Sequence, residues 1–106
     1  MNKQEIKTID IQAKEWFDKA NGNSYFSAIA TINFGLEGEK KVNIPFQYGY
    51  GDHYITIAFD QMETDGFLPL EATQMAAWRY CQENGIVLNT TKKEKCLKSE
   101  VRNWIY

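Results

Sequence analysis

FQYGYGDHYI, residues 46–55, marks the point where a strand-like pattern gives way to a helical one. Before this stretch, apolar and polar side chains alternate, which is typical of a strand with one buried face. After Asp52, which suits the N-cap of a helix, apolar residues recur at helical spacing until Gly66. Gly49 and Gly51 allow the backbone to turn sharply between the two elements. The stretch therefore predicts a strand that bends directly into a helix.

Three alternating segments precede this corner and predict an antiparallel meander. The first begins at Thr8 and changes phase at residues 15–17, where we expect a bulge or the strand end. Asn21-Gly22 follows and favours a tight hairpin turn. Pro45 cannot donate a hydrogen bond within a sheet, so we expect the third strand at an edge. The predicted apolar face consists of Ile9, Ile11, Ala13, Phe26, Ala28, Ala30, Ile32, Phe34, Val42, Ile44, Phe46 and Tyr48.

The second half of the chain supplies the cover that this apolar face needs. Pro69 suits the first turn of a second helix, which Asn84-Gly85 ends. Residues 86–88 form a short apolar run, which we interpret as a candidate fourth strand.

Two interpretations fit the C-terminal segment, residues 89–106. Thr91 and Glu94 have the spacing of a capping box, which indicates the start of a terminal helix. The apolar stripe of that helix would be Leu97, Val101, Trp104 and Ile105. A β-hairpin arm is the alternative.

Together these patterns predict an α+β fold, in which two to three helices cover one face of a three-stranded antiparallel meander. A short fourth strand is a possible addition to this sheet. Length (106 residues), hydrophobic content (43%) and charged content (25%) match one globular domain. We assign residues 1–106 to a single domain, with the sheet in 1–48 and a mostly helical cover in 52–105. No apolar run reaches the roughly 18 residues of a membrane span, so we expect a cytoplasmic protein with no membrane partner.

The cysteines do not indicate a metal site. Cys81, Cys96 and the single histidine, His53, are the available Cys and His ligands. A structural zinc site needs four ligands at characteristic spacing. We therefore expect no metal and no cofactor. In a reducing cytoplasm we expect both thiols to stay free, and a disulfide between them is the alternative.

Charge is distributed unevenly around a net value of −2. Residues 1–88 carry seven basic and twelve acidic side chains, whereas residues 89–106 carry five basic and two acidic ones. An acidic chain argues against broad capture of a phosphate backbone. The basic side chains near the end form either a solvated helix face or a polarised binding surface, and they are Lys92, Lys93, Lys95, Lys98 and Arg102.

Asp52-His53 is the only pair that resembles acid–base machinery. A reaction would also need a nucleophile or a second base within hydrogen-bond reach, and no Ser, Cys or Lys lies nearby in the sequence. We therefore assign no catalytic residue, and a hydrolase centred on His53 is the weakest alternative.

Aromatic side chains make up 14% of the chain, more than its small core can enclose. Because Tyr and Trp are preferred anchors of protein interfaces, we expect a non-enzymatic binding protein. The expected binding residues lie at the corner and the first hairpin, and they are Tyr48, Tyr50, Asp52, His53, Tyr54, Trp16, Asn23 and Tyr25. The alternative is a nucleic-acid or nucleotide-binding module, in which the tyrosines stack on bases and the basic C-terminal segment meets phosphate.

Two segments, WFDKANGNSYFS at residues 16–27 and FQYGYGDHY at residues 46–54, resemble small proteins of bacteriophages and integrated elements. That family has no assigned activity and no assigned catalytic residues. The resemblance implies a phage or mobile-element accessory protein in a bacterial host cell, such as an inhibitor of host defence. The expected partner is then a host protein, and the oligomeric state is left open.

Overall fold

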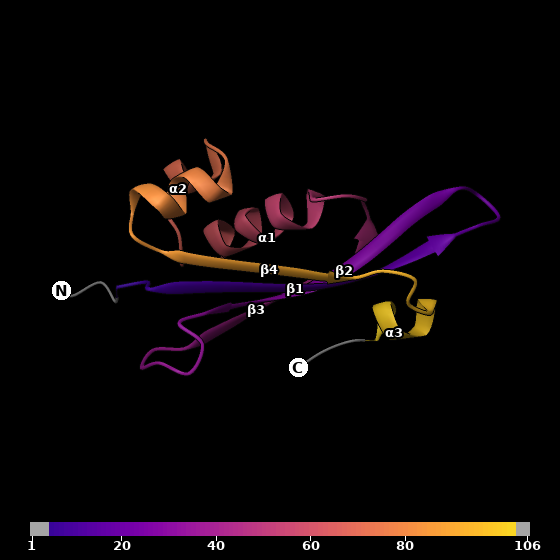
Figure 1. Cartoon of the computed structure of the whole chain (residues 1–106), viewed down its shortest axis with the longest axis horizontal. Coiled ribbons are helices and arrows are strands. Elements are labelled where there is room, and N and C mark those ends of the chain that lie inside the picture. Colours follow the sequence, from indigo (N-terminus) through magenta and orange to yellow (C-terminus); the bar gives the residue numbers. More distant parts are fainter. Residues whose placement is uncertain (1–4, 104–106) are drawn as a thin grey trace.

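A four-stranded mixed sheet organises the fold (Figure 1). The structure, a computed structural model, describes residues 5–103. The strands are β1 (Thr8–Asp18), β2 (Asn23–Ile32), β3 (Lys40–Tyr48) and β4 (Val87–Lys93), in the spatial order β3-β2-β1-β4. β2 pairs antiparallel with both β1 and β3, whereas β4 pairs parallel with β1. The predicted α+β class and antiparallel meander are confirmed, and β3, which contains Pro45, lies at an edge as expected.

Most of the helical cover lies on one face of this sheet (Figure 1). It consists of α1 (His53–Thr64), the 3-10 helix η1 (Leu70–Thr73) and α2 (Ala77–Glu83), which together form the crossover that a parallel β4 requires. The predicted second helix is thus two pieces, separated where Ala76 adopts an extended conformation. The main core lies beneath these helices, and its largest contributors are Ile9, Ile11, Phe26, Ile32, Val42, Ile44, Tyr54, Phe59 and Met62. Burying each such side chain stabilises the fold by about 1.5–3 kcal/mol.

The opposite face has a smaller cover of its own. α3 (Lys98–Arg102) lies on this side, away from α1 and α2 (Figure 1). Val101 is fully buried, and its carbonyl accepts a hydrogen bond of 2.6 Å from the Ser27 hydroxyl of β2. Ile29 and Thr31 are also buried on this face of β2. The sequence did not indicate this second layer, because Ser27, Ile29 and Thr31 read as the outward side of a half-buried strand.

The C-terminal segment contains both a strand and a helix. β4 extends to Lys93, so the candidate fourth strand is confirmed in a longer form. Thr91 lies inside this strand, and the predicted capping box is therefore wrong, since pairing with β1 holds residues 87–93 extended. α3 begins after Leu97, whose N–H donates to the Glu100 carboxylate at 2.8 Å. Trp104 and Ile105 of the predicted stripe lie outside the described residues.

β1 continues without interruption through residues 15–17, so the predicted bulge or strand end is wrong. Its pairing with β2 runs unbroken as far as Asp18. The two large neighbours coexist because Trp16 and Phe17 point to opposite faces of the strand, and Phe17 is exposed. The predicted hairpin turn is confirmed, with Gly22 at φ 71° donating its N–H to the Asp18 carbonyl at 2.7 Å.

β2 ends before the position that the alternation predicted. Asn33 adopts a positive φ of 56°, a conformation that Asn tolerates better than most residues. Its buried amide accepts a hydrogen bond from the Lys7 N–H at 2.7 Å and donates to the Glu5 carbonyl at 3.0 Å. Because the chain turns here, Phe34 is exposed instead of lying in the core as predicted.

A bulge interrupts β3 opposite Ser27. Two residues of β3, Pro45 and Phe46, lie opposite this single residue of β2. One extra residue shifts the alternation of a strand by one, so every later side chain changes face.

This bulge corrects the predicted apolar face of β3. Val42 and Ile44 are buried beneath the helices, as predicted. Phe46 and Tyr48 lie on the opposite face, where both rings contact Tyr25 or its neighbours. The prediction that they continue the core face is wrong because the extra residue reverses their orientation.

The corner after β3 depends on the close approach of Gly49 to an aromatic ring. A Cβ atom at Gly49 would lie 2.5 Å from Phe26 Cε1 and 2.9 Å from His53 Cδ2. The Gly49 N–H extends the ladder to the Ser24 carbonyl at 3.0 Å, and Gly51 then turns the chain at φ 62°. The predicted strand-to-helix corner is confirmed, and Asp52 holds the N-cap position of α1 without a side-chain capping hydrogen bond.

We predict that Gly49→Ala lowers the free energy of unfolding by about 1–3 kcal/mol, because the added methyl group overpacks against the Phe26 ring. Urea denaturation measures this loss. Phe26→Leu removes the ring edge, so Gly49→Ala should cost clearly less in that background than in the wild type. Equal costs in both backgrounds would show that Phe26 does not set the requirement for glycine.

Candidate functional site

Five aromatic side chains gather on the sheet face that α3 partly covers. Trp16 of β1 lies opposite Tyr25 of β2, and Tyr25 lies opposite Tyr48 of β3. The bulge adds Phe46, and the corner adds Tyr50. We call these five residues the aromatic cluster.

The rings of the aromatic cluster contact one another continuously. Tyr25 and Phe46 are stacked, with centroids 5.2 Å apart and planes within 5°. Trp16 stacks on Tyr25 at 5.6 Å, and Tyr48 meets Tyr25 edge-on at 5.9 Å. Tyr50 meets Tyr48 edge-on at 6.4 Å. Each such pair stabilises its arrangement by about 0.5–1.5 kcal/mol beyond area burial, so the cluster is a preorganised surface.

Exposure increases from the middle of the cluster toward the corner. Trp16, Tyr25 and Phe46 are half-buried, whereas Tyr48 and Tyr50 are 55% and 68% exposed. Lys98 of α3 places its Nζ 5.1 Å from the centroid of the Trp16 ring, within the range of a cation–π contact. The cluster is therefore flanked by a cation at its Trp16 end and open to solvent at its Tyr50 end.

On the helix face, Lys92 of β4 fixes the corner from which Tyr50 projects. Its Nζ lies 3.2 Å from Glu15 Oε2 of β1 and donates to the Gly51 carbonyl at 3.0 Å. The side chains of Lys92 and Glu15 are each only 13% exposed. One ammonium group therefore connects β4, β1 and the corner in a partly dehydrated setting.

Four of the eight predicted binding residues belong to the aromatic cluster, namely Trp16, Tyr25, Tyr48 and Tyr50. Asn23 is half-buried at the start of β2, next to the hairpin turn. Asp52 is exposed beside Tyr50. Tyr54 is only 5% exposed and belongs to the main core, so it contributes nothing to this surface.

His53 is exposed at the first position of α1. Its ring meets Phe26 edge-on at 6.3 Å. Within residues 5–103, no hydrogen bond or ion pair joins the imidazole to another side chain. The second group that the hydrolase alternative needs is therefore not brought to His53 by the described fold.

The predicted basic residues are separated by the structure. Lys92 is committed to Glu15 and Gly51 on the helix face, as described above. Lys93, Lys95 and Lys98 are exposed, and Arg102 is exposed in α3. Among the five, within residues 5–103, Lys98 is the one whose ammonium group contacts a ring of the aromatic cluster.

Phe46 was not among the predicted binding residues, because the alternation of β3 predicted it in the core. The available signal was Pro45, because proline in a strand is found at edges and bulges, and a bulge there would have reversed the orientation of the side chains after it.

Both cysteines are buried and unpaired, as expected, and burial raises the pKa of the Cys81 thiol to about 11.

Within the described part of the chain, no three His, Cys, Asp or Glu side chains gather so that they could hold a metal ion. None of the described helices is long and apolar enough to cross a membrane. Comparisons of the chain with protein-family models, curated proteins and solved structures find no match.

We predict that Lys92→Met lowers the free energy of unfolding by about 1–3 kcal/mol, because it leaves the Glu15 carboxylate and the Gly51 carbonyl without their shared donor. Lys93→Met is the matched control, since Lys93 is the exposed neighbour on the same strand. Thermal or urea denaturation compares the two variants. Similar stability of both would contradict the role assigned to Lys92.

Proposed function

We propose that this protein is a non-enzymatic binding protein and that the aromatic cluster is its contact surface for a protein partner. The observation that carries this proposal is the continuous contact of five rings, drawn from three strands and the corner, on one accessible face. Rigid aromatic rings offer a partner large contact area at a low cost in conformational entropy. Tyr48 and Tyr50 are the most exposed of the five and are the proposed anchors.

The orientation of the rings supports a protein partner over a nucleic acid. A base-stacking platform offers the flat faces of its rings to the ligand. Here the near-parallel stack of Tyr25 and Phe46, with Trp16 against Tyr25, already covers part of those faces. Lys98 lies over Trp16 as well. Stacking therefore leaves less of these flat faces free for a base, and the two tyrosines toward the corner are the most exposed rings.

A phage or mobile-element role is an extension of this proposal. Its motivation is the resemblance of residues 16–27 and 46–54 to small phage proteins. In the fold these two segments lie side by side and contribute all five members of the aromatic cluster. The extended proposal is an accessory or anti-defence factor that binds a host protein in the bacterial cytoplasm.

Nucleic-acid or nucleotide binding is the second candidate. The observation that favours it is Lys98 beside Trp16, with Lys93 and Lys95 exposed on the same segment. In this candidate the basic side chains meet phosphate, so affinity must depend strongly on salt.

The test of the proposal compares two double variants. Tyr48→Ala/Tyr50→Ala removes the proposed anchors, whereas Leu70→Ala/Trp78→Ala removes two apolar side chains of similar exposure, 61% and 65%, from η1 and α2. A partner is captured from bacterial lysate with the wild-type protein, identified by mass spectrometry and purified. The first variant should then bind at least about thirtyfold more weakly, and the control should bind as the wild type does.

Circular dichroism first establishes that both double variants are folded. Equal binding by the two variants would overturn the site assignment. Capture of nucleic acid instead, with affinity falling steeply as ionic strength rises, would favour the second candidate.

A further inference from the structure

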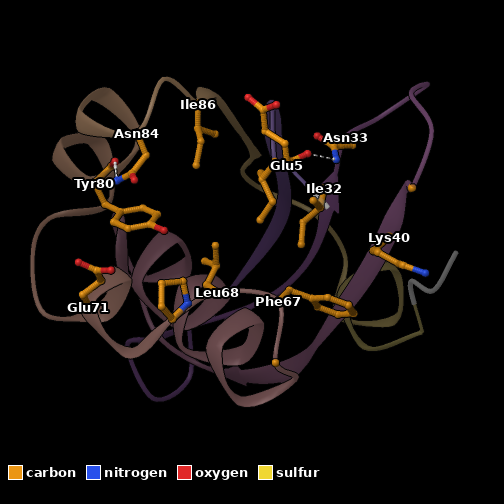
Figure 2. A pocket seen from close by; sticks show the side chains of 14 residues that line it. Glu5, Ile32, Asn33, Lys40, Phe67, Leu68, Glu71, Tyr80, Asn84 and Ile86 are labelled. Atoms are coloured by element: carbon orange, nitrogen blue, oxygen red, sulfur yellow. Dashed lines mark hydrogen bonds between the residues drawn. The ribbon is translucent and has the colours of Figure 1, made fainter. Parts of the chain in front are cut away.

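A cavity of about 530 Å³ lies at the opposite end of β1 from the aromatic cluster (Figure 2). Its walls come from the chain before β1, the end of β2, the start of β3, the loop after α1, and α2. The apolar part of the lining consists of Ile6, Ile32, Phe67, Leu68, Pro69 and Ile86. Cavities of this size and lining are typical of sites for small organic molecules.

Tyr80 of α2 directs its hydroxyl toward this cavity. The residue is only 6% exposed, and Figure 2 shows its hydroxyl turned toward the middle of the lining residues. Within residues 5–103 this hydroxyl has no hydrogen-bond partner, although the Tyr80 backbone carbonyl accepts a hydrogen bond from Asn84 Nδ2 at 2.8 Å. A hydroxyl that faces the cavity can donate or accept a hydrogen bond with a ligand bound there.

Charged side chains at the mouth give the cavity a polarity. Glu71 of η1 lies on the same side as Tyr80, and Lys40 lies on the opposite side (Figure 2). Glu5 is a second acid of the lining. None of these three side chains has an ion-pair partner in the described chain. The Tyr80 side of the mouth is therefore negative and favours a cation over an anion.

Burial, and to a smaller extent the negative charge of Glu71, raises the pKa of the Tyr80 phenol. The hydroxyl therefore stays neutral at physiological pH, and its lone pairs can accept a hydrogen bond from an ammonium group. The Glu71 carboxylate attracts the cation by its charge, and the neutral Tyr80 phenol orients the ammonium group through a hydrogen bond.

We propose that this cavity binds a small organic amine with an apolar ring. The ammonium group lies between the Tyr80 hydroxyl and the Glu71 carboxylate, and the ring packs against Leu68 and Ile32. This site is separate from the aromatic cluster and does not depend on the partner proposed for it.

The experiment uses three probes that share one ring and differ in charge: tryptamine, indoleacetamide and indoleacetate. Each is titrated into the full chain and followed by backbone amide NMR and calorimetry. Tryptamine should bind most tightly and indoleacetate least, with shifts concentrated at residues 67–71 and 80–86. Tyr80→Phe keeps the ring and should weaken tryptamine about three- to tenfold, the effect of one lost hydrogen bond.

Glu71→Gln, at an exposed position, provides a second variant that should fold normally. It should abolish the preference for tryptamine over indoleacetamide. Asp60→Asn is the control, since it removes an exposed carboxylate of α1 that lies outside the cavity lining, and it should leave tryptamine affinity unchanged. Absence of binding at millimolar probe, equal binding of the three probes, or shifts confined to the aromatic cluster would each overturn the proposal.

Discussion

The one-residue bulge in β3 is the constraint on which the candidate surface depends. Val42 and Ile44 face the helices, and uninterrupted alternation would send Phe46 and Tyr48 into the same layer, which Tyr54, Phe59 and Met62 of α1 already fill. The extra residue instead turns both rings to the other face, where Trp16 and Tyr25 extend from the hairpin. A local change of register thus divides the aromatic side chains of a small protein between a core and a surface.

The rest of the fold holds this division in place. Phe26 belongs to the core face, and its ring fits against Gly49 only because glycine has no Cβ. Lys92 connects Glu15 of β1 with the Gly51 carbonyl, so the corner that carries Tyr50 is fixed to the centre of the sheet. On the second face, the Ser27 hydroxyl anchors α3 through the Val101 carbonyl, which brings Lys98 to Trp16. The same short corner therefore belongs to the packing of one face and to the aromatic cluster on the other.

Periodicity predicted the three-stranded meander and the corner well, because alternation and helical spacing are local properties of the sequence. It did not predict the parallel pairing of β4, since the partner of Thr91 is Gln12, far away in the chain. Nor did it predict α3 on the second face, because a small polar side chain such as Ser27 is typical of a solvent-facing strand position and does not indicate a covering layer. Of the aromatic cluster, it named Trp16, Tyr25, Tyr48 and Tyr50 as candidate residues but placed Phe46 in the core, because a bulge leaves hydrophobic alternation unchanged in the sequence while reversing it in space.

The most direct test of this account is the environment of the Phe46 ring in solution. Nuclear Overhauser effects from its ring protons report which face of the sheet the side chain occupies. The account predicts cross-peaks with the ring protons of Tyr25 and Trp16, whose centroids lie 5.2 and 6.4 Å away. Cross-peaks with the buried side chains of α1, such as Ala58 or Phe59, would contradict it, because Phe46 would then lie on the core face and the aromatic cluster would not exist as described.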